Sequence, residues 1–245
     1  MAKGRLIYGF HAVAARLKQR PESVREVHLD PARDDPRVRN VLADAKAAGV
    51  KVVHSAGHRL DQMLPGARHQ GVACMVDAEE RALDLEDILD ALDQPALILA
   101  LDGVQDPHNL GACLRSADAM GVDAVIAPKD RAVGITPVVE KVASGAVETV
   151  PYLMVTNLAR SLETLQDRGV FVVGLAGEAG ADLPAVDLNG PAALVLGAEG
   201  DGLRRLTRER CDTLVRIPMF GAVESLNVSV ATGICLYEAR RQRRN

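Results

Sequence analysis

The sequence of 245 residues is poor in aromatic side chains, which make up 2% of it and include no tryptophan. Stacking of bases on aromatic rings is therefore not expected to be the main way of binding nucleic acid. Binding of RNA would have to depend on complementary charge and shape instead. The hydrophobic fraction of 48% is still sufficient for a core, and that core must be aliphatic.

Cysteine is also scarce. The four cysteines, Cys74, Cys113, Cys211 and Cys235, are widely spaced, with neither a C-x-x-C pair nor a Cys/His ligand pattern. We therefore expect neither a zinc site nor a disulfide framework. We expect the cysteines to be buried, reduced thiols instead. The sequence has no signal-peptide pattern and no apolar run of roughly 18 residues, so we expect a cytoplasmic protein without a membrane segment or a metal.

The net charge of −4 conceals an uneven distribution. Residues 1–76 hold 13 Lys and Arg against 7 Asp and Glu, whereas residues 77–95 hold one Arg against 8 acids. A basic N-terminal unit is typical of a protein that binds a polyanion, although a scatter of solvated Lys and Arg gives the same count. We therefore expect an RNA-binding domain over 1–76, an acidic linker over 77–95 and a second domain over 96–245.

Hydrophobic patterning predicts an α/β fold in both domains. In the first, helices and strands alternate: helices at 11–19 and 36–48, a short one near Leu60, and strands at 24–29, 51–54 and 71–76. In the second, apolar strands at 96–101, 124–127, 171–175, 193–196 and 214–217 alternate with helices at 110–120, 137–145, 158–168 and 228–243. This alternation predicts a doubly wound parallel sheet, in which ligands bind beyond the carboxyl ends of the strands.

Three segments share one construction, a core strand that runs into a turn with polar or glycine residues: 97–120, 192–205 and 215–231. Together they predict one composite site. The glycine spacing of Gly197, Gly200 and Gly202 is not that of a dinucleotide fingerprint, and no Walker lysine follows a glycine turn. A nucleotide-dependent oxidoreductase is therefore disfavoured.

Five polar residues in these segments are candidates for chemistry. Asn109 opens a predicted helix and is either its N-cap or a functional amide. Arg115 lies among small and apolar neighbours, where an arginine needs a partner, either Glu199 or a substrate phosphate. Glu199 could alternatively cap a helix. Ser225 and Asn227 stand at a strand-to-helix junction suited to holding a ligand, and Ser225 is not in a hydrolase nucleophile elbow.

These residues resemble the three motifs of the SpoU (TrmH) family of RNA ribose 2′-O-methyltransferases, in the SPOUT superfamily. Asn109 with Arg115 is similar to motif 1, Glu199 in residues 196–200 to motif 2, and Ser225 with Asn227 to motif 3. Residues 7–13, 69–71 and 233–239 extend the resemblance over essentially the whole chain. The members it resembles most methylate a guanosine in the P-site loop of the peptidyl-transferase centre of 23S ribosomal RNA.

The resemblance implies further properties. The second domain would be a SPOUT-type parallel sheet with a deep trefoil knot, and the first an RNA-binding domain of the ribosomal protein L30e type. S-adenosylmethionine would be held largely by backbone around Gly197, Ile217 and Leu226, with Ser225 and Asn227 completing the pocket. The protein would act as a homodimer.

The resemblance also places Arg115 nearest the ribose 2′-oxygen. A guanidinium is a poor base, so we expect Arg115 to bind the developing alkoxide or an adjacent phosphate. Asn109 and Glu199 would orient it, while Ser225 and Asn227 would shape the cofactor pocket. Two alternatives stay open: methylation of a different ribosomal or transfer RNA nucleotide, and a non-catalytic RNA-binding dimer.

Overall fold

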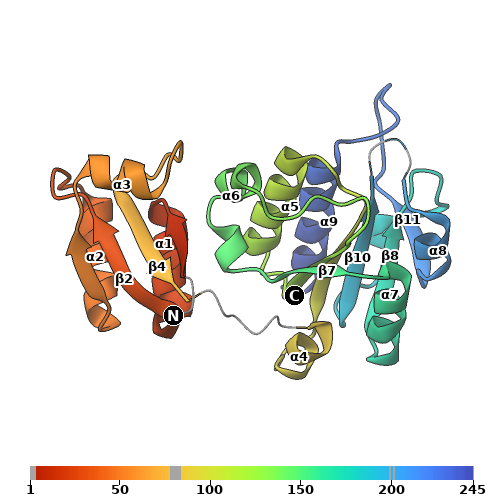
Figure 1. The fold of residues 1–245 in the computed structure, drawn as a ribbon. Helices are drawn as coiled ribbons and strands as arrows, with labels where there is room; N and C mark the ends of the chain where they lie inside the picture. Colours follow the sequence, from red (N-terminus) through yellow and green to blue (C-terminus); the bar gives the residue numbers. More distant parts are fainter. Residues whose placement is uncertain (1–3, 78–83, 199, 201, 245) are drawn as a thin grey trace. The chain divides into compact units, whose positions relative to one another are not determined.

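The computed structural model divides the chain into two compact units, residues 1–82 and 83–245, each described by itself here. The structure describes residues 4–77, 84–198, 200 and 202–244. Figure 1 shows both units as α/β structures. The expected α/β class, with a separate small N-terminal unit, is confirmed.

The first unit is a four-stranded sheet in the order β1-β4-β2-β3, in which β2 and β3 are parallel and the other pairs antiparallel. Helices α1 and α2 contact each other and pack on the sheet around Val13, Leu17 and Val41. Its elements in chain order are β1 (Arg5–Tyr8), α1 (Phe10–Gln19), a 3₁₀ turn (Pro21–Ser23), β2 (Val24–Leu29), α2 (Pro36–Ala47), β3 (Lys51–His54), α3 (Gly57–Met63) and β4 (Val72–Val76).

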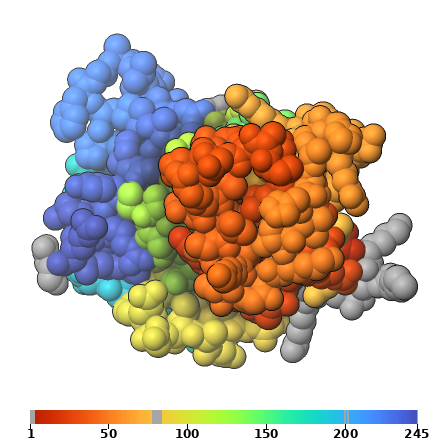
Figure 2. All heavy atoms as spheres, turned by 90° about the vertical axis from the view of Figure 1, so that its left-hand side faces the viewer, coloured from red at the N-terminus to blue at the C-terminus, as the bar shows by residue number. Residues whose placement is uncertain are grey.

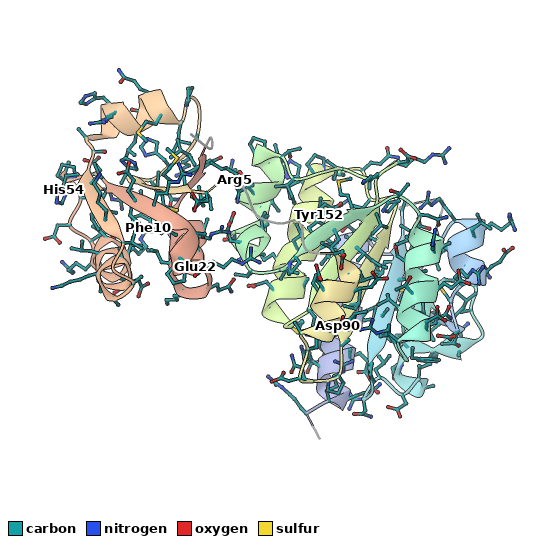
Figure 3. All side chains as sticks on the ribbon, turned by 60° about the horizontal axis from the view of Figure 1, so that its bottom comes forward. Arg5, Phe10, Glu22, His54, Asp90 and Tyr152 are labelled. Atoms are coloured by element: carbon teal, nitrogen blue, oxygen red, sulfur yellow. The ribbon has the colours of Figure 1, made fainter. Side chains whose placement is uncertain are left out.

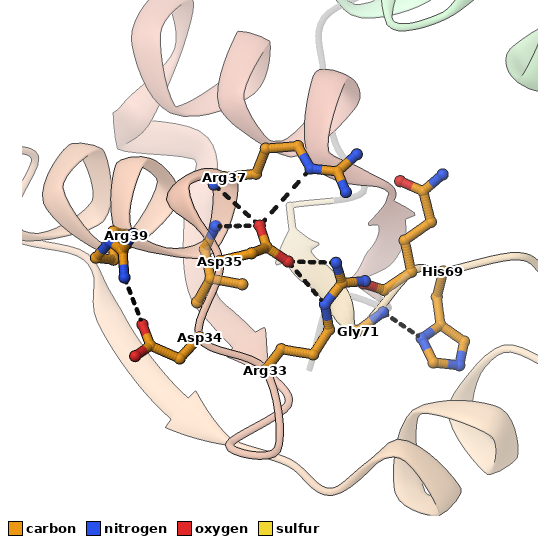
Figure 4. Close-up of polar contacts among 9 residues, drawn as sticks. Arg33, Asp34, Asp35, Arg37, Arg39, His69 and Gly71 are labelled. Carbon is orange, nitrogen blue, oxygen red and sulfur yellow. Dashed lines mark hydrogen bonds and ion pairs between the residues drawn. The ribbon is translucent and has the colours of Figure 1, made fainter.

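Helix α2 begins at a polar cluster built around Asp35 (Figure 4). Its carboxylate caps the helix by accepting hydrogen bonds from the backbone N–H groups of Arg37 and Val38, as an N-cap aspartate does. It also accepts a hydrogen bond from Arg33, which is the main reason that the pKa of Asp35 lies below its usual value. The guanidinium groups of Arg33 and Arg37 lie 5.1 and 5.0 Å from the ring centre of Phe10, which is labelled in Figure 3. Aromatic and carboxylate together hold both arginines at the start of α2.

The second unit is a seven-stranded sheet in the order β7-β6-β5-β10-β8-β11-β9, parallel throughout. Its helices and strands in chain order are α4 (Leu85–Asp90), β5 (Leu97–Asp102), α5 (Pro107–Ala119), β6 (Ala124–Pro128), α6 (Pro137–Ala143), β7 (Tyr152–Val155), α7 (Leu158–Asp167), β8 (Phe171–Leu175), β9 (Ala181–Asp182), β10 (Ala192–Gly197), α8 (Arg205–Glu209), β11 (Thr213–Arg216) and α9 (Val228–Gln242). Short 3₁₀ turns lie at Ala146–Glu148 and Leu183–Ala185.

Strand β5 shows why the sheet needs helices on both faces. All six of its residues are buried, and successive side chains point to opposite faces of the strand. Leu99 and Leu101 join a core with α5, α6 and α9, whereas Ile98 and Ala100 join a second core with α4 and α7. Figure 1 shows these two groups of helices on opposite sides of the sheet. The sheet is thus the middle layer of three, as the continuous apolar runs predict.

The expected linker over 77–95 is in part structured. Helix α4 lies within it, and Leu85 and Ile88 pack into the second core with exposures of only 8%. Strands β1 and β7 were also not expected. Both are short, with four residues each, and β7 is only half-buried at the edge of its sheet, so neither has the strong apolar run that marks β5.

The C-terminal helix is fastened at the amino-terminal edge of the sheet. The Arg243 guanidinium donates hydrogen bonds to four backbone oxygens, those of Pro95, Ala96, Leu188 and Gly190, at 2.6 to 3.0 Å. Pro95 and Ala96 immediately precede β5, and Leu188 and Gly190 lie in the segment that leads to β10. The end of α9 is therefore tied to the starts of the two central strands.

We expect Leu99→Ala to lower the free energy of unfolding by about 3 kcal/mol, because it leaves a cavity in a fully buried strand. Denaturant unfolding of the whole chain measures this. Leu206→Ala is the matched control, since Leu206 is 56% exposed on α8 and should cost less than about 0.5 kcal/mol. Equal losses in the two variants would contradict the assignment of β5 to the core.

Candidate functional site

A pocket of about 580 Å³ opens at the carboxyl edge of the second sheet. Three strand ends line it: residues 175–177 after β8, 196–198 and 202 around the end of β10, and 216–220 after β11. Residues 224–226 and the first turn of α9 complete the lining, and Asp182 of β9 stands at its side. A parallel sheet brings these ends together, so the pocket lies where the strand pattern predicts ligand binding.

Gly197, at the end of β10, leaves no space for a side chain. A Cβ atom there would lie 2.1 Å from the carbonyl carbon of Gly202 and 2.5 Å from the nitrogen of Leu203. The loop after β10 therefore folds back directly over Gly197, and the backbone N–H of Gly202 donates to the carbonyl of Ala198 at 3.1 Å. The pocket wall at this point is backbone.

Most of the predicted residues of the third segment also reach the pocket, whereas Asn227 is not among the residues that line it. Ile217, Ser225 and Leu226 line it together with Gly197. The loop that joins β11 to α9 projects from the body of the second unit, as Figures 1 and 2 show, and Phe220 within it is 97% exposed. One side of the pocket is thus formed by a largely exposed segment.

Asn227 connects the pocket to α5. It caps α9 by accepting hydrogen bonds from the backbone N–H and the hydroxyl of Ser229 at 2.9 and 2.6 Å. Its Nδ2 group donates to the side-chain oxygen of Asn109 at 2.9 Å. The first and third predicted segments, 118 residues apart, therefore meet side chain to side chain.

Of the two roles considered for Asn109, that of helix N-cap is excluded. Helix α5 begins earlier, at Pro107, and Asp106 is its N-cap, accepting a hydrogen bond from the backbone N–H of His108 at 2.9 Å. An Asp-Pro pair is a strong start signal, because the carboxylate caps and proline suits the first helical position. The Asn109 side chain is consequently available for Asn227.

The premise that Arg115 is buried among its apolar neighbours is wrong, while its expected pairing with Glu199 or a substrate phosphate stays a prediction. Cys113 and Leu114 point into the core, whereas Arg115 lies on the exposed face of α5, where a guanidinium is hydrated. Within the described ranges, no hydrogen bond or ion pair to Arg115 is found. Glu199, its predicted partner, lies outside the described residues. Arg115 is thus available to an incoming ligand.

Sequence reasoning missed part of the lining. Residues 175–177 follow a strand that was predicted, so the carboxyl-edge rule alone could have identified them. Arg216 and Asp182 form an ion pair at 2.8 Å beside the pocket, and nothing in their local sequence marks them. With Glu224, they give the pocket two carboxylates and one guanidinium.

The packing of α5 on α9 involves a buried thiol. Cys113 lies 3.4 Å from the hydroxyl of Thr232, and burial raises the pKa of Cys113 to about 11. Such a thiol stays protonated near neutral pH and does not act as a nucleophile. Its contribution is to the contact between the two helices that carry Asn109 and Asn227.

In the part of the chain that the structure describes, no three His, Cys, Asp or Glu side chains are grouped so that they could hold a metal ion. No helix in the same part has the length and apolar character needed to span a bilayer.

Comparison with protein families gives two matches. Residues 96–237 match the model described as the SpoU rRNA methylase family, and residues 6–82 match the model for RNA 2′-O ribose methyltransferase substrate binding. The chain is similar to the 23S rRNA (guanosine-2′-O-)-methyltransferase RlmB of Ralstonia nicotianae, with 58% identity over 99% of this chain and 98% of that one. It is 53% identical to the RlmB of Shewanella oneidensis over the full length of both.

Solved structures agree. The chain is similar to a crystal structure of an RNA 2′-O ribose methyltransferase, with a TM-score of 0.77 and 29% identity over 100% of this chain and 90% of that one. It is similar to the SpoU methyltransferase AviRb from Streptomyces viridochromogenes in complex with AdoMet, with a TM-score of 0.78 and 25% identity over 99% and 91%. Fold and pocket define an RNA methyltransferase of the SPOUT type. The chain belongs to the SpoU rRNA methylase family.

Proposed function

We propose that this protein transfers a methyl group from S-adenosylmethionine to the ribose 2′-hydroxyl of a guanosine in 23S ribosomal RNA. The observation that carries the proposal is the pocket at the carboxyl edge, which the Asn109–Asn227 hydrogen bond joins to the helix of Arg115. The relatives named for this reaction match over the whole chain. Within 23S RNA, the P-site loop of the peptidyl-transferase centre is the proposed target.

The residues of the pocket suit S-adenosylmethionine. A volume of about 580 Å³ is in the range of small-molecule sites, and leucine and isoleucine side chains with glycine backbone suit an adenosine group. Asp182 and Glu224 provide carboxylates for a cationic ligand. We assign cofactor binding to Gly197, Ile217 and Leu226, with Ser225 and Asn227 completing the pocket. When bound, S-adenosylmethionine supplies an electrophilic methyl group.

The protein's part in the reaction is orientation and charge stabilisation. A ribose hydroxyl is a weak nucleophile, so its approach must be aligned, and the negative charge that develops on its oxygen must be stabilised. The exposed Arg115 guanidinium can donate hydrogen bonds to that oxygen or to an adjacent phosphate. It does not act as the base, because guanidinium groups keep their protons in proteins.

The remaining polar residues orient this arginine and the substrate. Asn227 holds the Asn109 amide in one orientation, so the first turn of α5 presents a fixed polar group. We assign to Asn109 and Glu199 the orientation of Arg115 and the ribose. We also assign Ser225 to the catalytic residues, in a position beside the reacting groups.

The N-terminal unit, expected over residues 1–76, is proposed to bind the RNA substrate. Its surplus of basic residues supports this, as does the substrate-binding family model that residues 6–82 match. The arginines around Asp35 include Arg37 and Arg39, whose side chains are 60% and 59% exposed and can reach phosphates (Figure 4). Because ribosomal RNA is the substrate, we infer that the enzyme acts in the cytoplasm. The trefoil knot and the L30e-type likeness stay predictions.

We further propose that the protein acts as a homodimer through α9. Val230, Ile234 and Tyr237 are 50, 40 and 60% exposed and follow each other along one helical face. An exposed apolar stripe of this kind is typical of an interface. Ser116, the neighbour of Arg115, lies close to Gly233 in the middle of α9. A second copy on this stripe would therefore approach the proposed catalytic arginine.

The test of function is transfer of labelled methyl groups from S-adenosylmethionine to 23S RNA, followed by mapping of the 2′-O-methylated nucleotide. Modification of one guanosine supports the proposal. Modification of another ribosomal or transfer RNA position would redirect the substrate assignment, and RNA binding without methyl transfer would indicate a non-catalytic dimer.

We expect Gly197→Ala to weaken S-adenosylmethionine binding by about tenfold or more, because the new Cβ displaces the backbone of Gly202 that lines the pocket. Isothermal titration calorimetry measures the dissociation constant. Gly190→Ala is the matched control, since a Cβ there meets nothing within 4 Å. An unchanged affinity in Gly197→Ala would mean that the cofactor binds elsewhere.

We expect Arg115→Lys to slow single-turnover methyl transfer by about a hundredfold, because an ammonium cannot reproduce the two-point contact of a guanidinium. Its dissociation constant for S-adenosylmethionine should stay within about threefold of the wild-type value. Arg160→Lys, at an exposed arginine of α7 on the other side of the sheet, should leave both quantities unchanged. A near-normal single-turnover rate in Arg115→Lys would remove Arg115 from the reaction.

We expect Ile234→Glu to convert the dimer into a monomer, because it places a charge in the middle of the α9 stripe. Sedimentation equilibrium should show half the mass of the wild-type protein. Leu206→Glu, at an exposed leucine outside the stripe, is the control and should keep the dimer. An Ile234→Glu protein with the mass of the wild type would place the interface elsewhere.

A further inference from the structure

Asp102, the last residue of β5, carries a buried carboxylate at the edge of the pocket region. Its side chain is completely inaccessible to solvent, and it stands opposite Gly197 in the register of β5 with β10. A buried carboxylate is costly unless it is paired and hydrogen-bonded. Asp102 therefore needs a partner that stays in a fixed position beside its carboxylate.

That partner is Arg204, at the far end of the loop after β10. The backbone N–H of Arg204 donates to Oδ2 of Asp102 at 2.9 Å, and its Nε and Nη2 groups both lie 2.5 Å from Oδ1. Backbone and side chain of one residue thus engage both carboxylate oxygens. Contacts at three points, two of them from the charged guanidinium, determine the orientation of Arg204 as well as its position.

The loop between these anchors is short and closed on itself. Ala198 pairs with Gly202 in an isolated antiparallel bridge, and Gly200 and Gly202 have the positive φ values of 85° and 64° that favour glycine. Leu203 next to it packs against Gly174 of β8. Residue 199, the glutamate of the second predicted segment, belongs to this loop by its place in the sequence.

We propose that Asp102 and Arg204 are positioning residues for methyl transfer, whose ion pair holds Ala198, Gly202 and Leu203 of the segment after β10 in their reactive orientation. The pair joins the strand that leads to Asn109 and Arg115 with the loop whose Ala198 and Gly202 line the pocket. It thereby sets the two halves of the reacting centre relative to each other. The inference rests on the proposed function, and it adds to it two residues that touch neither cofactor nor RNA.

Arg204→Ala is the informative variant. It removes the guanidinium but keeps the backbone N–H that donates to Oδ2, so Asp102 is not left without a hydrogen bond. We expect single-turnover methyl transfer, at saturating S-adenosylmethionine and 23S RNA, to slow by about tenfold or more. Affinity for the RNA should change by less than about threefold, and amide exchange should become faster in residues 197–203.

Further variants separate positioning from other roles. Arg204→Lys should recover part of the rate, since an ammonium can still pair with Asp102. Asp102→Asn should be slow as well, and the double variant Asp102→Asn/Arg204→Ala should be no slower than the slower single variant. Arg168→Ala is the control: its guanidinium is also 39% exposed and pairs with Asp90, labelled in Figure 3, away from the loop. It should transfer methyl groups at the wild-type rate.

Wild-type protein that transfers no methyl group would refute the proposed function itself. With an active wild type, an Arg204→Ala rate within about twofold of normal would overturn the inference alone. A higher RNA dissociation constant at an unchanged saturated rate would overturn it too, because Arg204 would then be an RNA contact.

Discussion

The structure depends on the parallel pairing of β5 with β10. Six residue pairs, from Leu97 with Ala192 to Asp102 with Gly197, join segments that are nearly 100 residues apart in sequence. Because both strands are buried on both faces, this register is strongly determined by packing. It aligns the ends of the two strands, so the turn that leads to Asn109 and the loop that follows Gly197 begin side by side. The site is a consequence of that alignment.

The polar groups at this edge are organised locally before any ligand arrives. Asp106 starts α5 and Asn227 starts α9, and each does so with a side chain that accepts from its own first turn. Helix caps therefore also determine where Asn109 and Asn227 meet. Arg115 differs from Asn109 and Asn227 because, in the described part of the chain, no hydrogen bond or ion pair to its guanidinium is found, which suits the contact with the substrate proposed above.

The sequence predicted the fold well where apolar runs were long. Strands such as β5 and β10 are buried on both faces, and their ends are marked by glycine or aspartate, so their limits were predicted to within a residue or two. Edge strand β7 and helix α4 were missed or underrated, since short segments at the border of a core contain too few buried residues to show a period. Tertiary contacts, which the sequence does not display, decide those segments.

The site was predictable to the extent that it follows strand ends. Gly197, Ile217, Ser225 and Leu226 come together at one pocket because parallel strands share a carboxyl edge. The cap of α5 depends on where the helix begins, which is three residues before the predicted start, and the exposure of Arg115 depends on which face of α5 packs on the core. The pairing of Arg204 with Asp102 bridges 102 residues and leaves no trace in local spacing.

Arg243 holds the C-terminal end of α9 in a fixed position. Its four bonds to carbonyl groups hold the last turn of α9 beside the starts of β5 and β10, at the edge of the sheet opposite to the pocket. A surface linker or affinity tag attached after residue 245 would therefore leave the ligand entrance of that unit unobstructed. Deleting the last few residues instead, even for convenience in crystallisation, would remove the hydrogen bonds that tie α9 to the starts of the two central strands.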